Sequence, residues 1–171
     1  MTDLAGATLN AIKVRITRVL PMQVHTAVEK LTDEQLWWRP NEKSNSIANL
    51  ILHIAGSLDH YLNRAIGGFA YDRDRDAEFA ARDKTSKARL LARLDEMVGR
   101  AVTTFNRLTT DHLSGPSTDP DRNNVLIEDL ISINTHLADH VGQIVWIAKM
   151  LSESSLDEAW MRAHKRGGAW K

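Results

Sequence analysis

The sequence of 171 residues predicts one all-α domain with the architecture of a four-helix bundle. Apolar residues recur with the helical period over long intervals, and only 9 glycines and 4 prolines interrupt them. Hydrophobic residues make up 43% of the chain and charged residues 26%, values typical of globular domains. A chain of this length can bury a sizeable core without disulfides or a structural metal. We therefore expect four amphipathic helices, each of about 20 to 28 residues, packed side by side.

Breaks between the apolar segments give the predicted boundaries. Pro21 should kink or end the first helix, because proline removes a backbone donor and clashes with the preceding turn. The glycine pair at 67–68 should end the second helix, and the alternating charges of residues 72–76 predict a solvated loop after it. Residues 152–171 are predicted to be a tail beyond a bundle of residues 1–151. The four predicted helices cover about residues 3–29, 44–66, 85–108 and 124–151.

The composition excludes several classes of protein. Lys+Arg and Asp+Glu both count 22, so the chain lacks the positive excess with which proteins bind nucleic acid or anionic membranes. No stretch approaches the roughly 18 consecutive apolar residues of a membrane span, and the N-terminus does not resemble a secretion signal, so we expect a cytoplasmic protein. The absence of cysteine excludes disulfides and catalysis by a protein thiol, and it leaves His, Asp and Glu to hold any metal.

Three histidines have the spacing of a metal centre. His136 and His140 lie four residues apart on the fourth predicted helix, so both rings project from one face about one turn apart. His53 lies midway along the second helix, at the edge of its apolar face. If these helices pack side by side, the three imidazoles form a site with open positions, which is the ligand count of a catalytic metal centre. Imidazole suits Zn, Ni, Fe and Cu, so the metal stays open.

Other residues are weaker candidates. Gln143, one turn beyond the second histidine of the pair, is placed to hydrogen-bond a ligand, and His60 is placed to line the mouth of the site. Trp38 is a candidate pocket wall and Arg39 a candidate anion contact, although packing and solvated surface are the commoner roles of such residues. Trp146 is expected to pack. For the histidine pair, exposed or hydrogen-bonded core histidines without a metal are the ordinary alternative.

Longer motifs resemble those of a known superfamily. Residues 45–56, Asn-Ser-Ile-Ala-Asn-Leu-Ile-Leu-His-Ile-Ala-Gly, look like the second-helix motif of the DinB-like superfamily. The segment His136-x-x-x-His140-Val-Gly-Gln-Ile resembles its fourth-helix motif. Residues 73–79 are similar to one bacterial branch of unknown function within it. The likeness covers about residues 1–151 in the family's order, and the tail departs from that branch.

The resemblance implies an up-up-down-down four-helix bundle that frequently forms homodimers. It also implies a divalent metal, Zn, Ni or Fe, on three histidines that correspond to His53, His136 and His140. Characterised relatives include transferases and isomerases that use low-molecular-weight thiols such as mycothiol or bacillithiol, with the metal activating the thiol as thiolate. The lack of cysteine is consistent with this chemistry, because the nucleophile would come from the small thiol.

Two classes of function follow from these observations. The leading hypothesis is a metal-dependent enzyme, a thiol S-transferase or isomerase that takes a small-molecule substrate, with a hydrolase at the same site as a variant. The alternative is a non-enzymatic dimeric bundle, with a structural metal or none, that binds a small ligand or a protein partner. The fourth ligand of the metal distinguishes the two classes of function. An exchangeable water there supports catalysis, whereas a fourth protein ligand supports a structural role.

Overall fold

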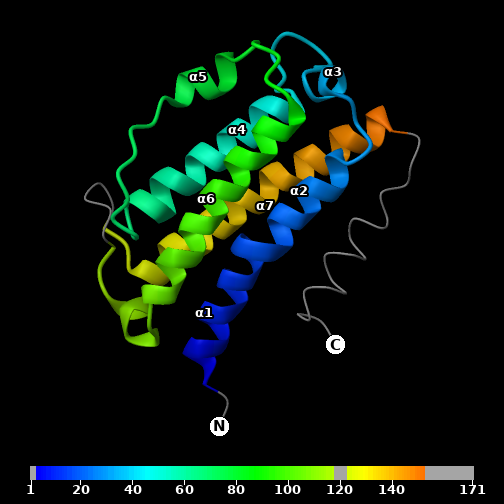
Figure 1. The fold of residues 1–171 in the computed structure, drawn as a ribbon. Helices are drawn as coiled ribbons and strands as arrows, with labels where there is room; N and C mark the ends of the chain where they lie inside the picture. The colour runs from blue at the N-terminus through cyan, green and yellow to red at the C-terminus, as the bar shows by residue number, and fades with distance from the viewer. Residues whose placement is uncertain (1–2, 118–122, 153–171) are drawn as a thin grey trace.

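The computed structural model describes residues 3–117 and 123–152, so the predicted tail beyond residue 152 lies outside the described residues. The described chain is all-helical and without a strand, which confirms the predicted all-α class (Figure 1). No helix in this part of the chain is long and apolar enough to cross a membrane. The elements are α1 (Leu4–Val14), η1 (Arg15–Val19), α2 (Leu20–Val28), α3 (Asp33–Leu36), α4 (Ile47–Leu58), η2 (Asp59–Arg64), α5 (Arg75–Ala80), α6 (Lys87–Arg107), η3 (Thr110–Ser114) and α7 (Leu126–Leu151).

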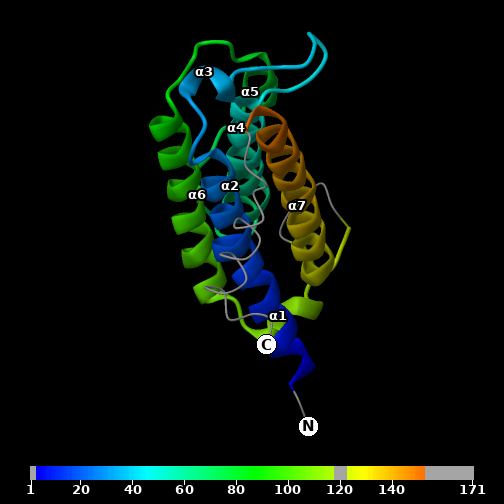
Figure 2. The same cartoon turned by 90° about the vertical axis from the view of Figure 1, so that its right-hand side faces the viewer.

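The longer elements form four helical rods. These rods lie side by side in both views (Figures 1 and 2). The first rod consists of α1, η1 and α2 joined end to end, and the second of α4 and η2. The third and fourth rods are α6 and α7. The short helix α3 lies at one end of the rods, between the first and the second along the chain (Figure 2). The ends of the rods fall within three residues of the predicted helix boundaries.

The directions of the rods differ from the expected up-up-down-down order. The ammonium of Lys87 donates to the carbonyl of Leu31 at 2.6 Å, and the Gln35 amide donates to the carbonyl of Leu151 at 3.2 Å. The end of the first rod, the start of the third and the end of the fourth therefore share one end of the molecule. The rods run up, down, down and up along the chain (Figure 1).

The connections between the rods explain this order. Residues 29–46 turn back at α3, so the second rod runs opposite to the first (Figure 1). Residues 65–86, here called the crossover, return along the second rod before the third begins, so these two rods run in the same direction (Figure 1). The expectation was wrong because helical periodicity locates the rods but does not tell whether a connection turns back or crosses over.

The first rod continues through Pro21 rather than ending there. The π-helical turn η1 lies directly before the proline, and its last hydrogen bond runs from the N–H of Leu20 to the carbonyl of Arg15. A π turn has wider i→i+5 bonding than an α-helix, so the backbone opens where proline has no N–H to donate. One irregular turn therefore accommodates the residue that was expected to kink or end the helix.

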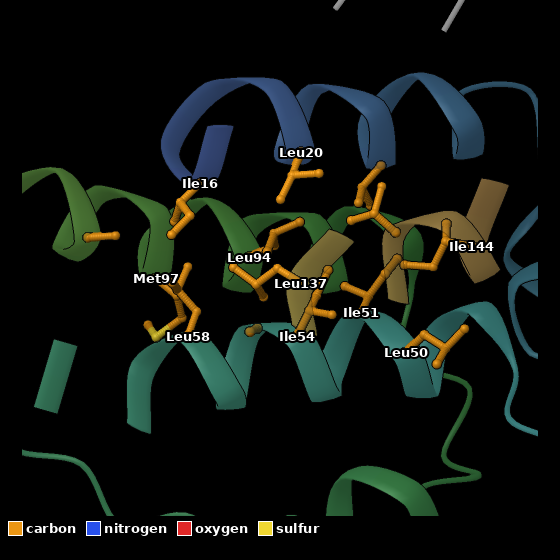
Figure 3. Close-up of a cluster of buried hydrophobic side chains, with 14 of the residues drawn as sticks. Ile16, Leu20, Leu50, Ile51, Ile54, Leu58, Leu94, Met97, Leu137 and Ile144 are labelled. Carbon is orange, nitrogen blue, oxygen red and sulfur yellow. The ribbon is translucent and has the colours of Figure 1, made fainter. Parts of the chain in front are cut away.

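The core consists mainly of branched aliphatic side chains from all four rods (Figure 3). Along each helix these side chains recur every three or four residues, which is the spacing that the sequence predicted for buried faces. The second and fourth rods contribute the most members, eight each. The helix α4 is buried on almost every side between α6, α7 and the crossover. The labelled members of the cluster are Ile16, Leu20, Leu50, Ile51, Ile54, Leu58, Leu94, Met97, Leu137 and Ile144.

Trp146 does not pack into this core, contrary to the expectation for it. Its surface is 63% exposed, and Ile131 and Met150 on the same helix are each 51% exposed. The residues of α7 that face the core, such as Leu137 and Ile144, lie on the other side of the helix. The tryptophan is therefore a surface residue of the described chain.

Replacing one buried isoleucine should test the importance of this packing. We expect Ile51→Ala to lower the free energy of unfolding by about 2–5 kcal/mol, because Ile51 is fully buried and its removal leaves a cavity. Ile131→Ala is the matched control on the exposed face of α7 and should change that free energy by less than about 0.5 kcal/mol. Urea denaturation at 25 °C measures both, and equal losses in the two variants would contradict the assignment of the core.

Candidate metal centre

The structure brings the three predicted histidines together. His53 on α4 and His136 and His140 on α7 form one group, in which one ring nitrogen from each lies within 4.8 Å of the others. The Nε2 atoms of His53 and His136 are 3.1 Å apart. The three rings meet edge to face, with centroids 4.6 to 5.1 Å apart. His53 is buried, whereas the other two are half-buried and leave one side open.

The two helices that carry the histidines run in opposite directions, and each supplies its ligands from mid-length. On α7 the four-residue spacing places His136 and His140 on one side of the helix, next to the buried stripe of Leu137 and Val141. On α4 the buried face includes His53 itself. Packing of aliphatic side chains above and below the group therefore fixes the distance between the helices at the point where the imidazoles meet.

The geometry of the group fits a divalent metal. Two nitrogens bound tetrahedrally to one ion at about 2.0–2.1 Å lie about 3.3 Å apart, close to the observed spacing of the His53 and His136 Nε2 atoms. A ring nitrogen of His140 lies within 4.8 Å of both. Among the described residues the group contains three protein ligands, so a bound ion would keep at least one open position.

Electrostatics favours neutral imidazoles in this group. Burial, followed by the neighbouring His140 and His53, lowers the pKa of His136 to about 4. Burial also lowers the pKa of His140, although its hydrogen bond with Gln143 opposes this shift. Neutral imidazole is the form that binds a metal, so two of the three ligands are held in the required state at pH 7.

A buried ion pair sits behind His53. The Glu78 carboxylate accepts two hydrogen bonds from the Arg73 guanidinium, at 2.8 and 2.9 Å, and one from His53 Nδ1 at 2.9 Å. The side chains of Arg73 and Glu78 are only 7% and 5% exposed. Burial by itself would raise the pKa of the Glu78 carboxyl, but the hydrogen bonds from His53 and Arg73 and the guanidinium charge hold it below its ordinary value.

This pair fixes the tautomer and the orientation of His53. The Arg73 guanidinium has only donors and cannot accept a hydrogen bond. The ionised carboxylate of Glu78 is therefore the acceptor for an N–H on Nδ1 of His53. Nε2 then carries the lone pair and points toward the other two histidines. A carboxylate behind a metal-ligating histidine also raises the basicity of the ligand. The ring of Phe79, whose centroid is 4.5 Å from that of His53, packs beside it.

Two residues of α4 hold the crossover in place. Asn49 is fully buried, and its side-chain amide donates to the carbonyls of Glu78 and Ala81, at 3.0 and 3.2 Å. Gly56 provides space for the carboxylate, because a Cβ at this position would overlap Glu78 Oε1 and lie 2.9 Å from its Cδ. Glycine is unfavourable inside a helix by about 1 kcal/mol, and this close approach explains its presence.

Arg73 and Glu78 were not predicted from the sequence to be parts of the site. The expectation of a solvated loop at residues 72–76 was wrong for Arg73, because its charge is buried against Glu78. The alternating signs resemble those of a solvated segment, and the partner lies five residues away on α5. The glycine inside the second predicted helix was the available signal that something approaches its backbone closely.

Of the remaining predicted site residues, some lie at the three histidines and others do not. Gln143 lies at the site, with Oε1 3.1 Å from Nδ1 of His140. His60 lies in η2, about two turns beyond His53, and its ring packs edge-on against that of Tyr61. Arg39 contacts Glu42 at 3.4 Å in the connection after α3, and the neighbouring Trp38 is 37% exposed. The structure therefore gives neither Arg39 nor Trp38 a contact with the three histidines.

Adding a methyl group at Gly56 should disturb the ion pair behind His53. We expect Gly56→Ala to displace the Glu78 carboxylate and lower the free energy of unfolding by about 1–3 kcal/mol, since buried charged groups lose partners. Urea denaturation measures the stability, and the NMR signal of the His53 Nδ1 proton, which the hydrogen bond to Glu78 protects from exchange, should be lost.

Gly99→Ala is the matched control for this substitution. Gly99 lies inside α6, where a Cβ would meet nothing within 4 Å, so alanine should raise the free energy of unfolding by up to about 1 kcal/mol. Equal stabilisation by both substitutions, with the Nδ1 proton signal retained, would show that Gly56 has no role in placing Glu78.

Comparison with known proteins adds a family but no activity. Comparison with curated proteins gives no match. A family of proteins of unknown function, DUF1572, matches residues 3–161, which include all three histidines as well as Arg73 and Glu78. The match extends from the start of the first rod to beyond the last described residue. The chain therefore belongs to the DUF1572 family.

Proposed function

We propose that this protein is a metal-dependent enzyme that uses a divalent ion on His53, His136 and His140 to activate a low-molecular-weight thiol for transfer to a small electrophile. The observation that carries the proposal is the convergence of three imidazole nitrogens within 4.8 Å of one another. Among the described residues no fourth protein ligand joins this group. A structural zinc site has four protein ligands, whereas a catalytic site has three and an open position.

The residues around the group support an anionic co-ligand. Burial favours the neutral forms of His136 and His140, and the charge of Glu78 is balanced by Arg73. A divalent ion held there would lower the pKa of a bound thiol or water and so supply a nucleophile near neutral pH. The chain's own residues hold the geometry: Glu78 orients His53, Gln143 lies at hydrogen-bonding distance from His140, and Phe79 packs against one side of the His53 ring.

We also propose that the DUF1572 family, and this chain with it, is part of the DinB-like superfamily and that the four rods form its four-helix bundle. The motifs at residues 45–56 and 136–144 support this placement, since the structure positions the histidines of both motifs at one site. The thiol class, the assembly as a homodimer and a choice among Zn, Ni and Fe rest on that resemblance.

Metal analysis tests the site itself. We expect about one divalent ion per chain after loading untagged protein with Zn²⁺ or Ni²⁺ and dialysing it, as measured by elemental analysis. His140→Ala should lose the ion, and Glu78→Gln should weaken its binding by about 10- to 100-fold because His53 loses its charged partner. His25→Ala is the control and should keep the ion, because this half-buried histidine of α2 is paired with Asp95 and lies outside the group. A wild type without metal after loading would refute the proposal.

Thiol reactivity tests the chemistry. We expect protein loaded with Co²⁺ to develop a sulfur-to-cobalt charge-transfer band when mycothiol or bacillithiol is added, and metal-loaded protein to speed conjugation of that thiol to a generic electrophile. His140→Ala should lose both signals, whereas His25→Ala should retain them. Unchanged spectra together with no rate above background for any thiol would refute thiol activation while leaving the metal site intact.

A further inference from the structure

A cavity of about 520 Å³ lies between α4, the crossover and α6, next to the metal centre. Its lining includes Glu78, whose carboxylate contacts His53, but none of the three histidines. Leu52 and the buried Leu90 provide an apolar floor. A volume of this size is in the range of small-molecule sites, which combine an apolar surface with a few polar groups.

One wall of the cavity carries two arginines. Arg89 and Arg93 lie four residues apart on α6, so their side chains share one face of the helix. Within residues 3–117 and 123–152 neither forms an ion pair, and the Arg93 guanidinium has only a long contact, 3.5 Å, with the hydroxyl of Tyr71. Most of their donors therefore face the cavity or solvent. The planar guanidinium fork matches the geometry of a carboxylate.

Carboxylates line the cavity as well as arginines. Asp72, Asp74 and Asp83 line the cavity. The carboxylates of Asp74 and Asp83 already accept hydrogen bonds from the backbone N–H of Ala77 and from Thr85, respectively. Asp72 makes no hydrogen bond or ion pair to another described residue. With Glu78, which is already paired with Arg73, a simple anion would meet four carboxylates here, and a simple cation would meet two guanidinium groups.

We propose that this cavity binds a small zwitterion of the amino-acid class, either a free apolar amino acid or a short peptide. Arg89 and Arg93 bind its carboxylate, Asp72 binds its ammonium group, and its side chain rests on Leu52 and Leu90. The site is distinct from the metal centre, although the two share the wall formed by Glu78. The proposal does not depend on the thiol chemistry proposed for the three histidines.

Isothermal titration with the dipeptide leucyl-leucine tests the proposal. We expect saturable binding, weakened about 10- to 100-fold by N-acetylation, which removes the ammonium group, and by C-terminal amidation, which removes the carboxylate. Equal affinity for the three forms, or no saturable binding of the unmodified dipeptide at millimolar concentration, would overturn it.

Variants locate the binding and separate it from the metal centre. The double substitution Arg89→Gln and Arg93→Gln should abolish dipeptide binding but leave the metal content unchanged. Arg64→Gln removes an exposed arginine of η2 outside the cavity and should leave dipeptide binding unchanged. His140→Ala should lose the metal and still bind the dipeptide. Undiminished binding by the double variant would overturn the assignment to this cavity, whatever the metal analysis shows.

Discussion

The buried ion pair between Arg73 and Glu78 connects the crossover to the three-histidine group. Removing two charges from water costs several kcal/mol per ion, so the pair persists only because its geometry is nearly complete. Arg73 donates twice to the carboxylate, and His53 supplies a third hydrogen bond from the bundle side. The crossover is thereby fixed to α4 at one point, and this same contact orients the His53 ring of the three-histidine group.

The other features of the site follow from that contact. The carboxylate can approach α4 only where a side chain is missing, which is at Gly56. The short helix α5 must lie along α4, and the amide of Asn49 satisfies the carbonyls at its C-terminal end. A crossover running along the second rod also delivers the chain to the end where the third rod begins (Figure 1). The contacts that hold the crossover against α4 therefore agree with the path that the crossover follows to the third rod.

Sequence reasoning could locate the rods and the three histidines because both depend on short-range spacing. Helical periodicity gave rod boundaries within three residues, and the four-residue spacing of His136 and His140 put both on one side of α7. The direction of the rods and the burial of Arg73 depend on how the crossover folds back, which no local pattern encodes. The expectation for Trp146 was wrong for another reason: it followed the residue type, whereas the spacing from Leu137 and Ile144 places Trp146 on the opposite face of α7.

The charge balance around His53 bears on what the site can bind. With three neutral imidazoles as ligands, a dication keeps its full charge unless a nearby anion compensates it. The Glu78 carboxylate contacts His53 from behind, but Arg73 already neutralises it through two hydrogen bonds. The pair therefore orients His53 without reducing the positive charge of the centre. A site built this way retains its attraction for an external anion, which is the property that thiolate activation requires.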